Sequence, residues 1–321
     1  MELVYPDICK LLKNNAKLLP FPGLNPEYVL ADSYRDPQLT AKFFVYQQQD
    51  DIYYHPFHIR KIPHTSYNEI ISAYGYGGPI ATTHDSHFLA DAFINYKSWC
   101  KEKNIIAETI RFHPLSQNWH FYQGLSIAIK HTVYVDLRNV DLMNSYESSA
   151  RWSIRKALKN DVKCKLVDAD LFLRIFPTLY SKRMNEINAK DFYYFNQDYF
   201  NSLCRMDNVL RLIALHNDEV IGAAFMLLED KIMEYHLSAN NNKGKQLQAM
   251  NLILHEAFLY AQSRGCHAAH LGGGTTANAA DPLYLFKLSF AGQLAEYRIG
   301  TYIHNQQIYD ELISQKLLEV R

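Results

Sequence analysis

The stretch from His270 to Gly292 contains the residues best suited to chemistry. It reads H-L-G-G-G-T-T-A-N-A-A-D-P-L-Y-L-F-K-L-S-F-A-G, so a predicted strand ends in Gly272, Gly273 and Gly274 before a polar loop. Consecutive glycines let a backbone approach a ligand without side-chain clash. Pro282 is expected to open a short helix, and the free N–H groups at a helix start can bind an anion.

Lys287 is the only charged residue between Leu283 and Phe290. Its ammonium could reach water along its aliphatic stem, pair with a neighbour or meet a ligand. Asp281 precedes this helix, and N-capping explains it without catalysis. The residues alone leave a solvated lysine and a lysine that meets a ligand both open.

The composition is that of a globular protein long enough for two domains. The chain has 321 residues, 48% of them hydrophobic and 21% charged, with 33 basic and 33 acidic side chains. Zero net charge argues against a protein built for non-specific nucleic-acid binding, although it is compatible with a local basic patch.

The cysteines and the hydropathy pattern bear on the cellular compartment. Five cysteines are dispersed without a metal-ligand spacing: Cys9, Cys100, Cys164, Cys204 and Cys266. We expect free thiols in a reducing compartment and no metal site. No secretory signal is evident and no run of about 18 apolar residues occurs. The sequence therefore predicts a cytoplasmic protein without a membrane span.

Periodicity and turn residues predict most of the elements. Strands are expected at 42–47, 52–60, 67–74, 105–112, 133–137, 162–167, 209–215, 220–228, 231–238, 266–271 and 294–303. Helices are expected at 5–19, 85–103, 146–160, 169–186, 246–264 and 306–318. Asp85 and Ser145 are predicted caps, Pro56 predicts a sheet edge or a bulge, and Pro177 predicts a disturbed helix.

These elements repeat in order and spacing. A helix, a hairpin, a strand with a loop, a helix and a strand occur between residues 5 and 112, and again between 169 and 271. The offset of roughly 160 to 168 residues indicates an internal duplication. We predict an α/β (α+β) fold of two similar halves with mixed sheets flanked by helices. The predicted domains are 1–145 and 146–321, the second beginning with the helix at 146–160 and ending with the C-terminal strand and helix.

Three cations follow one face of the predicted helix at 146–160. Arg151, Arg155 and Lys156 stand at i, i+4 and i+5. Such a face could bind RNA or nucleotide phosphates, or it could simply be solvated. Both interpretations stay open.

The loop Y-G-Y-G-G-P combines aromatic residues with glycines. Tyr74 and Tyr76 could stack on an acceptor sugar or peptide, while the N–H groups of Gly77 and Gly78 could bind its oxygens. The alternative is a tight structural loop.

Arg111 and His113 follow the end of a predicted strand. They could meet a diphosphate or a carboxylate, although Arg111 could equally pair with Glu108.

Six motifs together resemble the Fem family, which contains the peptidoglycan-bridge aminoacyltransferases and related acyltransferases. In chain order they are Y-G-Y-G-G-P (74–79), E-T-I-R-F-H-P-L (108–115), R-W-S-I-R-K-A-L-K-N (151–160), E-Y-H-L-S-A (234–239), H-L-G-G-G (270–274) and L-F-K-L-S-F-A-G (285–292). Each motif is weak alone, but the set covers most of the chain in the family's order.

The resemblance implies two GNAT-like domains in tandem and assigns roles to several residues. Lys287 matches the family's lysine beside the donor ester, and Arg183 becomes a candidate for phosphate binding. Tyr235 would lie on the strand that edges the acyl groove, where its hydroxyl could donate to the tetrahedral oxygen. Glu234 and His236 would point to the opposite face from Tyr235.

Three functions are compatible with the sequence. The first is transfer of an aminoacyl group from aminoacyl-tRNA to an amine of a UDP- or lipid-linked peptidoglycan precursor. The second is acyl-CoA-dependent N-acylation of an amino sugar, which is disfavoured because N-N-N-K-G-K (240–245) lacks the glycine pattern of a CoA pyrophosphate loop. The third is a catalytically silent binder of cell-wall precursors. No permanently bound cofactor is expected, and a protein general base need not exist, because proximity supplies much of the rate.

Overall fold

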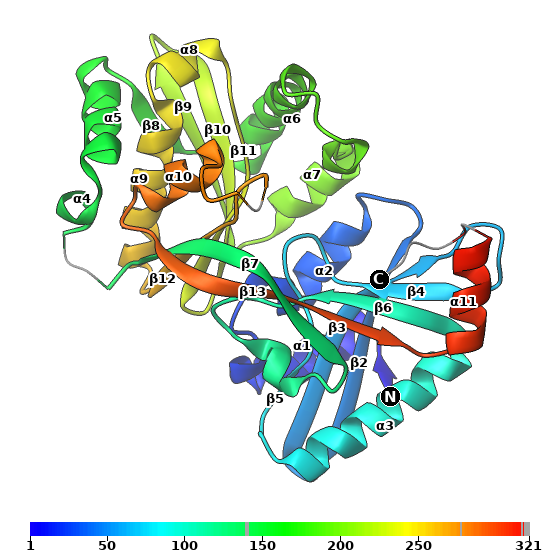
Figure 1. Ribbon diagram of the computed structural model, residues 1–321. Helices are drawn as coiled ribbons and strands as arrows, with labels where there is room; N and C mark the ends of the chain where they lie inside the picture. Colours follow the sequence, from blue (N-terminus) through cyan, green and yellow to red (C-terminus); the bar gives the residue numbers. More distant parts are fainter. Residues whose placement is uncertain (139–140, 277, 316, 318–321) are drawn as a thin grey trace. The chain divides into compact units, whose positions relative to one another are not determined.

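The computed structural model describes residues 1–138, 141–276, 278–315 and 317 (Figure 1). The chain forms two compact units, one of Met1–Lys130 with Glu296–Arg321 and one of His131–Ala295. These units differ from the predicted domains at two places. Residues 131–145 group with the second unit, and the C-terminal strand and helix group with the first. Strand pairing across long sequence separations decides both differences, as the sheets show.

The sheet of the first unit is mixed. Strands β2 (Leu39–Gln48), β3 (Asp51–Lys61) and β4 (Asn68–Ile71) run antiparallel in that order, and β6 (Ile105–Arg111) then pairs parallel to β4. A parallel neighbour needs a crossover, which α3 (Ser86–Glu102) supplies. The C-terminal half of β13 (Gln293–Ile303) pairs antiparallel to β6 through Ile299–Ile303.

The sheet of the second unit repeats this order. Strands β9 (Val209–His216), β10 (Glu219–Glu229) and β11 (Ile232–Asn240) are antiparallel, and β12 (Ala268–Gly272) is parallel to β11 after the crossover helix α9 (Ala249–Ser263). The C-terminal part of β7 (Leu125–Asp136) then pairs antiparallel to β12 through Val133–Asp136. The duplicated α/β architecture predicted from the sequence is confirmed, and each half takes its last strand from outside its own repeat.

Helices cover both faces of each sheet (Figure 1). In the first unit α3 packs its Trp99 ring against Phe57, while His58, the next residue of β3, bonds to the Val29 carbonyl of α2 (Pro26–Ser33) on the other face. In the second unit the ring of Phe172 in α6 (Ala169–Glu186) packs against Phe225 of β10. The other face of that sheet carries α9 and α5 (Ser148–Lys159).

The remaining elements are short. The strands are β1 (Glu2–Leu3), β5 (Ile80–Ala81) and β8 (Lys163–Leu166). The helices are α1 (Tyr5–Lys13), α4 (Leu142–Ser145), α7 (Gln197–Arg205), α8 (Asn242–Gln246), α10 (Pro282–Leu288) and α11 (Gln306–Ser314), and the 3-10 turns are Ala16–Leu18, Pro22–Leu24, Asn118–Phe121 and Asp191–Tyr193. The predicted C-terminal helix reached Leu318, which lies outside the described residues. Among the described residues, no helix combines the length and apolar character that a membrane crossing requires.

Local sequence signals explain several boundaries. Asp85 caps α3 as predicted, because its carboxylate accepts from the Phe88 N–H at 2.8 Å. Asn217 and Asp218 both adopt positive φ, 50° and 61°, which suits the two-residue turn between β9 and β10. The predicted Ser145 cap is wrong, since α5 begins after Glu147 and the Ser145 hydroxyl instead donates to the Leu142 carbonyl at 2.7 Å within α4.

Pro56 and Pro177, which lie inside a strand and a helix, are both accommodated. Pro56 lies in β3 opposite Phe43 of β2, and on its other side it falls between the residues that pair with β5 and those that pair with β4. The missing N–H therefore costs no ladder bond there. Pro177 stands inside α6, which continues through it from Ala169 to Glu186. All five cysteines are free thiols.

A buried carboxylate fixes the C-terminal segment to the first unit. Glu108 on β6 accepts from the hydroxyls of Tyr96 at 2.6 Å and Tyr122 at 2.5 Å, and His304, just after β13, lies 3.3 Å from it. Burial alone would raise the pKa of Glu108, but the hydrogen bond and charge of His304 outweigh burial and lower it. The anion is therefore compensated by partners from three distant parts of the sequence.

His55 is a second buried ionisable group in this core. The rings of Phe57 and Tyr96 lie 5.0 and 5.2 Å from its imidazole, and neither ring nitrogen has a hydrogen-bond partner among the described residues. Burial lowers the pKa of His55 to about 4.

We expect His55→Phe to reduce the loss of folding stability that the wild type shows as the pH falls. Between pH 6.5 and 4 the unfolded chain protonates this histidine and the folded chain does not, so folding loses on the order of 3 kcal/mol as pH falls through that window. Urea unfolding at several pH values should show this loss in the wild type and not in the variant. His87→Phe, on an exposed position of α3, is the control. Parallel curves for wild type and His55→Phe would contradict the burial argument.

Candidate acyl-transfer site

Strands β11 and β12 part shortly after they meet. Their parallel ladder covers only Ile232–Glu234 and Ala268–His270, whereas β11 continues to Asn240 along β10. Within the described ladder, the edge of β11 beyond Glu234 no longer pairs with β12. Parting strands leave room near their carboxyl ends, where substrates bind in open α/β sheets. The glycine loop follows β12 at this point.

Asp281 fixes that loop to the start of α10. Its carboxylate accepts from the N–H groups of Thr276 at 3.0 Å, Leu283 at 2.9 Å and Tyr284 at 3.0 Å. The Thr275 hydroxyl also donates to it, and this bond is the main reason that the pKa of Asp281 lies well below its usual range. The predicted capping role is confirmed, and the carboxylate has no spare capacity for catalysis.

The three glycines serve this arrangement in different ways. Gly272 has φ +74°, which favours glycine. A Cβ on Gly274 would lie 2.7 Å from the Asp281 carboxylate, so the close approach predicted here is made to the chain's own cap. The carbonyl of Gly273 accepts from the Lys287 ammonium at 2.6 Å.

Lys287 points inward. The residue is only 6% exposed, and its Nζ lies 5.9 Å from the centre of the Tyr235 ring. The solvated interpretation of this lysine is therefore wrong. The Tyr235 hydroxyl shares a short hydrogen bond with the Ser238 hydroxyl, and burial raises the pKa of Tyr235 to about 12, so it stays a proton donor. The structure thus brings Lys287, Tyr235 and the glycine loop together, as predicted.

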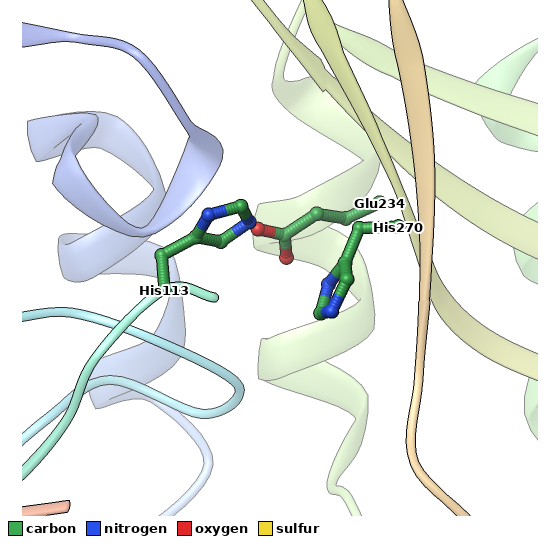
Figure 2. A group of neighbouring side chains, drawn as sticks. All are labelled: His113, Glu234 and His270. Atoms are coloured by element: carbon green, nitrogen blue, oxygen red, sulfur yellow. The ribbon is translucent and has the colours of Figure 1, made fainter. Parts of the chain in front are cut away.

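The sequence did not identify a second polar pair in this unit, Glu234 and His270. Figure 2 shows these side chains next to each other, from adjacent positions of β11 and β12. A carboxylate oxygen of Glu234 and a ring nitrogen of His270 lie within 4.8 Å, and His270 Nε2 is 3.0 Å from the Thr132 hydroxyl. Burial raises the pKa of Glu234 to about 7, although His270 acts to lower it.

Glu234 and Tyr235 face opposite sides of the sheet, as predicted. Tyr235 packs on the apolar cluster beneath α9, whereas His236, on the Glu234 side, hydrogen-bonds the Tyr199 hydroxyl of α7 at 2.7 Å. The signal for the missed pair was an acidic residue and a histidine in two predicted strands, which becomes informative only when the strands are known to be neighbours.

The cations of α5 divide into two kinds. Arg151 donates to the backbone carbonyls of Tyr146 and Asn144, so its guanidinium fixes the turn before the helix. Arg155 is exposed, and the Lys156 ammonium lies 5.0 Å from the centre of the Trp152 ring. Only the latter two of the three predicted cations face outward.

Arg183 belongs to a small charge cluster at the end of α6. It lies 3.3 Å from Glu186, which also accepts from Lys245 of α8 at 2.7 Å. The hydrogen bond from Lys245, followed by that from Arg183, lowers the pKa of Glu186. The phosphate-binding role of Arg183 remains a prediction.

The Y-G-Y-G-G-P loop of the first unit is tightly built. The Asn118 amide donates to the carbonyls of Gly77 at 2.9 Å and Pro79 at 3.0 Å, and the Gly77 N–H donates to the Arg111 carbonyl at 2.7 Å. Gly78 has φ +101°, and a Cβ there would lie 2.9 Å from the Asn118 amide. The Gly77 N–H is thus already used within the unit, which favours the structural interpretation of this loop.

The aromatic and charged candidates of the first unit lie around that loop. The Tyr74 N–H donates to Asp32 at 2.8 Å, and the Tyr76 ring meets His113 edge-on at 5.3 Å. His113 stacks on Phe21 at 4.4 Å and accepts from a backbone N–H through Nδ1.

Two of the earlier charge assignments change as a result. Burial lowers the pKa of His113 to about 3, so a neutral imidazole replaces the cation expected for a diphosphate. Arg111 is not the partner of Glu108, whose oxygens bond to Tyr96, Tyr122 and His304. The Arg111 guanidinium instead interacts with the Tyr297 hydroxyl. Burial raises the pKa of Tyr297, and the charge and hydrogen bond of Arg111 partly oppose this rise.

Comparison with known proteins relates this part of the chain to a family. A family model described as the FemAB family matches residues 205–309, which include both strands, the glycine loop and Lys287. This segment is therefore similar to the FemAB family. The predicted resemblance to the Fem family is thereby confirmed. No curated protein matches the chain.

Solved structures show the same architecture over nearly the whole chain. The crystal structure of FemX superposes with a TM-score of 0.75 at 15% identity, covering 97% of this chain and 99% of that one. L-PGS from Bacillus licheniformis gives 0.61 at 13% identity, covering 100% and 98%. A tandem GNAT protein from the clavulanic acid biosynthesis pathway gives 0.52 at 9% identity, covering 94% of each chain.

These similarities confirm the predicted fold of two GNAT-like halves. At such low identities the structures establish the fold alone. The FemAB match over the site supports an acyltransferase at the level of the family.

We expect Glu234→Gln to change how stability depends on pH. A carboxyl with a folded pKa near 7 and an unfolded value of about 4.3 favours folding at low pH, and this contribution of order 3 kcal/mol is lost as pH rises to about 7. The variant should therefore gain stability on the wild type between pH 4.5 and 8 in urea unfolding. Glu219→Gln, exposed in the β9–β10 hairpin, serves as the control. A constant difference between wild type and Glu234→Gln would rule out the raised pKa.

Proposed function

We propose that this protein transfers an aminoacyl group from aminoacyl-tRNA to an amine of a UDP- or lipid-linked peptidoglycan precursor. The observation that carries the proposal is the Lys287 ammonium, held between the Gly273 carbonyl and the Tyr235 ring where β11 and β12 part. The FemAB match over this region supports the reaction class. The proposal implies action in the bacterial cytoplasm, where charged tRNA and nucleotide-linked precursors occur.

The proposed reaction requires the protein to position the two substrates and to stabilise one developing negative charge. The acceptor amine attacks the ester carbonyl of the donor, and the carbonyl oxygen becomes an oxyanion. Lys287 is suited to stabilise this charge, and the protonated Tyr235 hydroxyl can donate to it. Collapse of the intermediate forms the amide bond and releases the ribose oxygen, which receives the proton that the amine gives up. The Asp281 carboxylate is occupied by capping and does not serve as a general base. The acceptor amine must therefore bind in its neutral form, and proximity supplies much of the rate.

The connection between β11 and α9 supports a tRNA ester over acyl-CoA as the donor. A CoA pyrophosphate would need free backbone N–H groups at this place. The Gly244 N–H instead donates to the Asn241 side chain at 2.8 Å, and the Lys245 N–H donates to the Asn241 carbonyl at 3.0 Å. A Cβ on Gly244 would lie 2.1 Å from the Ile221 carbonyl, so this glycine is needed for packing.

Lys287→Ala should fold and lose turnover. Removing one fixed group that stabilises an oxyanion costs about 100- to 1,000-fold in kcat. Single-turnover transfer from charged tRNA to a UDP-linked muropeptide measures this loss, and Lys243→Ala, an exposed lysine of α8, is the matched control. Wild-type rates in Lys287→Ala, with a native unfolding transition, would remove the catalytic assignment.

Tyr235→Phe tests the second donor separately. The change removes one hydroxyl and its bond to Ser238 while the ring beneath Lys287 remains. We expect a fall in kcat of about tenfold or more with KM little changed, because the hydroxyl acts on charge that exists only in the transition state. Ser238→Ala separates loss of the donor from loss of its orientation. An effect on KM alone would assign Tyr235 to substrate binding.

A thermal-shift comparison tests the choice of donor and acceptor. A ligand that binds only the folded state raises the unfolding midpoint. Charged tRNA and a UDP-muramoyl pentapeptide should each raise it, and acetyl-CoA should not. A shift with acetyl-CoA and a UDP-amino sugar, without a shift for the muropeptide, would replace the proposal with sugar N-acylation.

A further inference from the structure

Helix α5 presents an unusual outer face. Its inward side is marked by Ala150, Ile154 and Ala157, which are buried against the core beneath α9. Figure 1 shows α5 at the outside of the second unit. The opposite side, two residues on from each buried position, carries Trp152, Lys156 and Lys159, with Arg155 beside them. We call these four residues the α5 face.

The α5 face is locally basic in a chain without net charge. No acidic residue occurs between Ser148 and Lys159, whereas the whole protein has 33 acidic and 33 basic side chains. Arg151 is engaged by backbone carbonyls, which leaves three cations of this helix facing outward. A concentrated patch of this kind attracts an anionic surface at short range.

Large apolar side chains lie among these cations. Trp152 is 58% exposed and Leu158, on the flank of the α5 face, is 50% exposed. Tryptophan and leucine combined with lysine and arginine are the composition of helices that lie in a membrane interface. A leucine side chain cannot hydrogen-bond a phosphate or stack on a nucleobase, so its presence among the cations favours a lipid surface over RNA.

The α5 face is also tied to the candidate site. The Glu147 N–H, at the start of α5, donates to the Ser289 carbonyl at the end of α10 at 2.9 Å. The Tyr146 ring packs against Phe290 at 5.2 Å. The helix that carries Lys287 is therefore anchored to the helix that carries the α5 face, within one unit.

We propose that the α5 face docks on the surface of an anionic phospholipid bilayer. Cations contact the headgroups, and Trp152 and Leu158 enter the interface between headgroups and acyl chains. Docking would hold the Lys287 site close to the membrane surface, where a lipid-linked acceptor presents its polar head. The proposal goes beyond the acyl transfer and does not depend on the identity of the donor.

Vesicle co-sedimentation at low salt tests the charge requirement. Wild-type protein should bind phosphatidylcholine vesicles that contain about one third phosphatidylglycerol, and bind pure phosphatidylcholine far less. Arg155→Glu with Lys159→Glu should weaken the partition by about thirtyfold or more, since each basic residue near such a surface contributes about a fivefold factor. The matched control reverses the exposed β8 residues Lys163 and Lys165, with the same change in net charge, and should bind like the wild type.

Tryptophan fluorescence tests the depth of contact. Of the three tryptophans, Trp99 is 8% exposed and Trp152 is 58% exposed. Anionic vesicles should shift the emission of the wild type to shorter wavelength, and Trp152→Phe should abolish this shift while unfolding like the wild type. Lipids brominated near the headgroup should quench Trp152.

Several outcomes would overturn the proposal. Binding that is equal in the two charge-reversed double variants would mean that net charge, and not the α5 face, drives the association. Absence of binding to anionic vesicles at low salt would exclude the bilayer. If uncharged tRNA binds and Arg155→Glu with Lys159→Glu abolishes that binding, while vesicles do not bind the wild type, the α5 face is a nucleic-acid surface instead.

Discussion

The buried ammonium of Lys287 is the constraint on which the candidate site depends. A cation that is 6% exposed must find polar partners inside the protein, because its desolvation is costly. The Gly273 carbonyl and the face of the Tyr235 ring provide them, and the bond to Gly273 ties α10 to the end of β12. Asp281 fixes the first turn of that helix and Lys287 its second. The positions of three features therefore depend on one another: helix α10, Gly273 after β12, and the Tyr235 ring.

Local signals were sufficient for much of the fold. The caps at Asp85 and Asp281 and the turn at Asn217 and Asp218 depend on residues within a few positions of each other, so the sequence predicts them directly. The domain boundary was different. It depends on the contact between Glu108 and His304, which are 196 residues apart, and on the pairing of β13 with β6. No local pattern encodes which sheet receives the last strand.

The site was predictable to a similar extent. Lys287, Tyr235 and the glycine loop follow from chemistry and motif, because two of the three lie in one continuous stretch. Glu234 and His270 escaped notice, since only the parallel pairing of β11 and β12 makes them neighbours. Arg151 was misjudged for another reason. Its spacing on the helix matches Arg155, but the backbone carbonyl of Tyr146 lies within its reach and holds it.

The return of the chain to the first unit bears on how the protein is made. The Ile299–Ile303 part of β13 completes the first sheet, and Tyr309 and Leu312 of α11 complete a small apolar cluster with Ile106 of β6. On the ribosome, the first unit therefore cannot complete its sheet until β13 and α11 have emerged, whereas β7 to β12 of the second unit are made before them. The nascent chain must therefore carry an unfinished sheet edge at β6 until β13 has been made, and an unpaired edge of this kind is prone to pair with other chains.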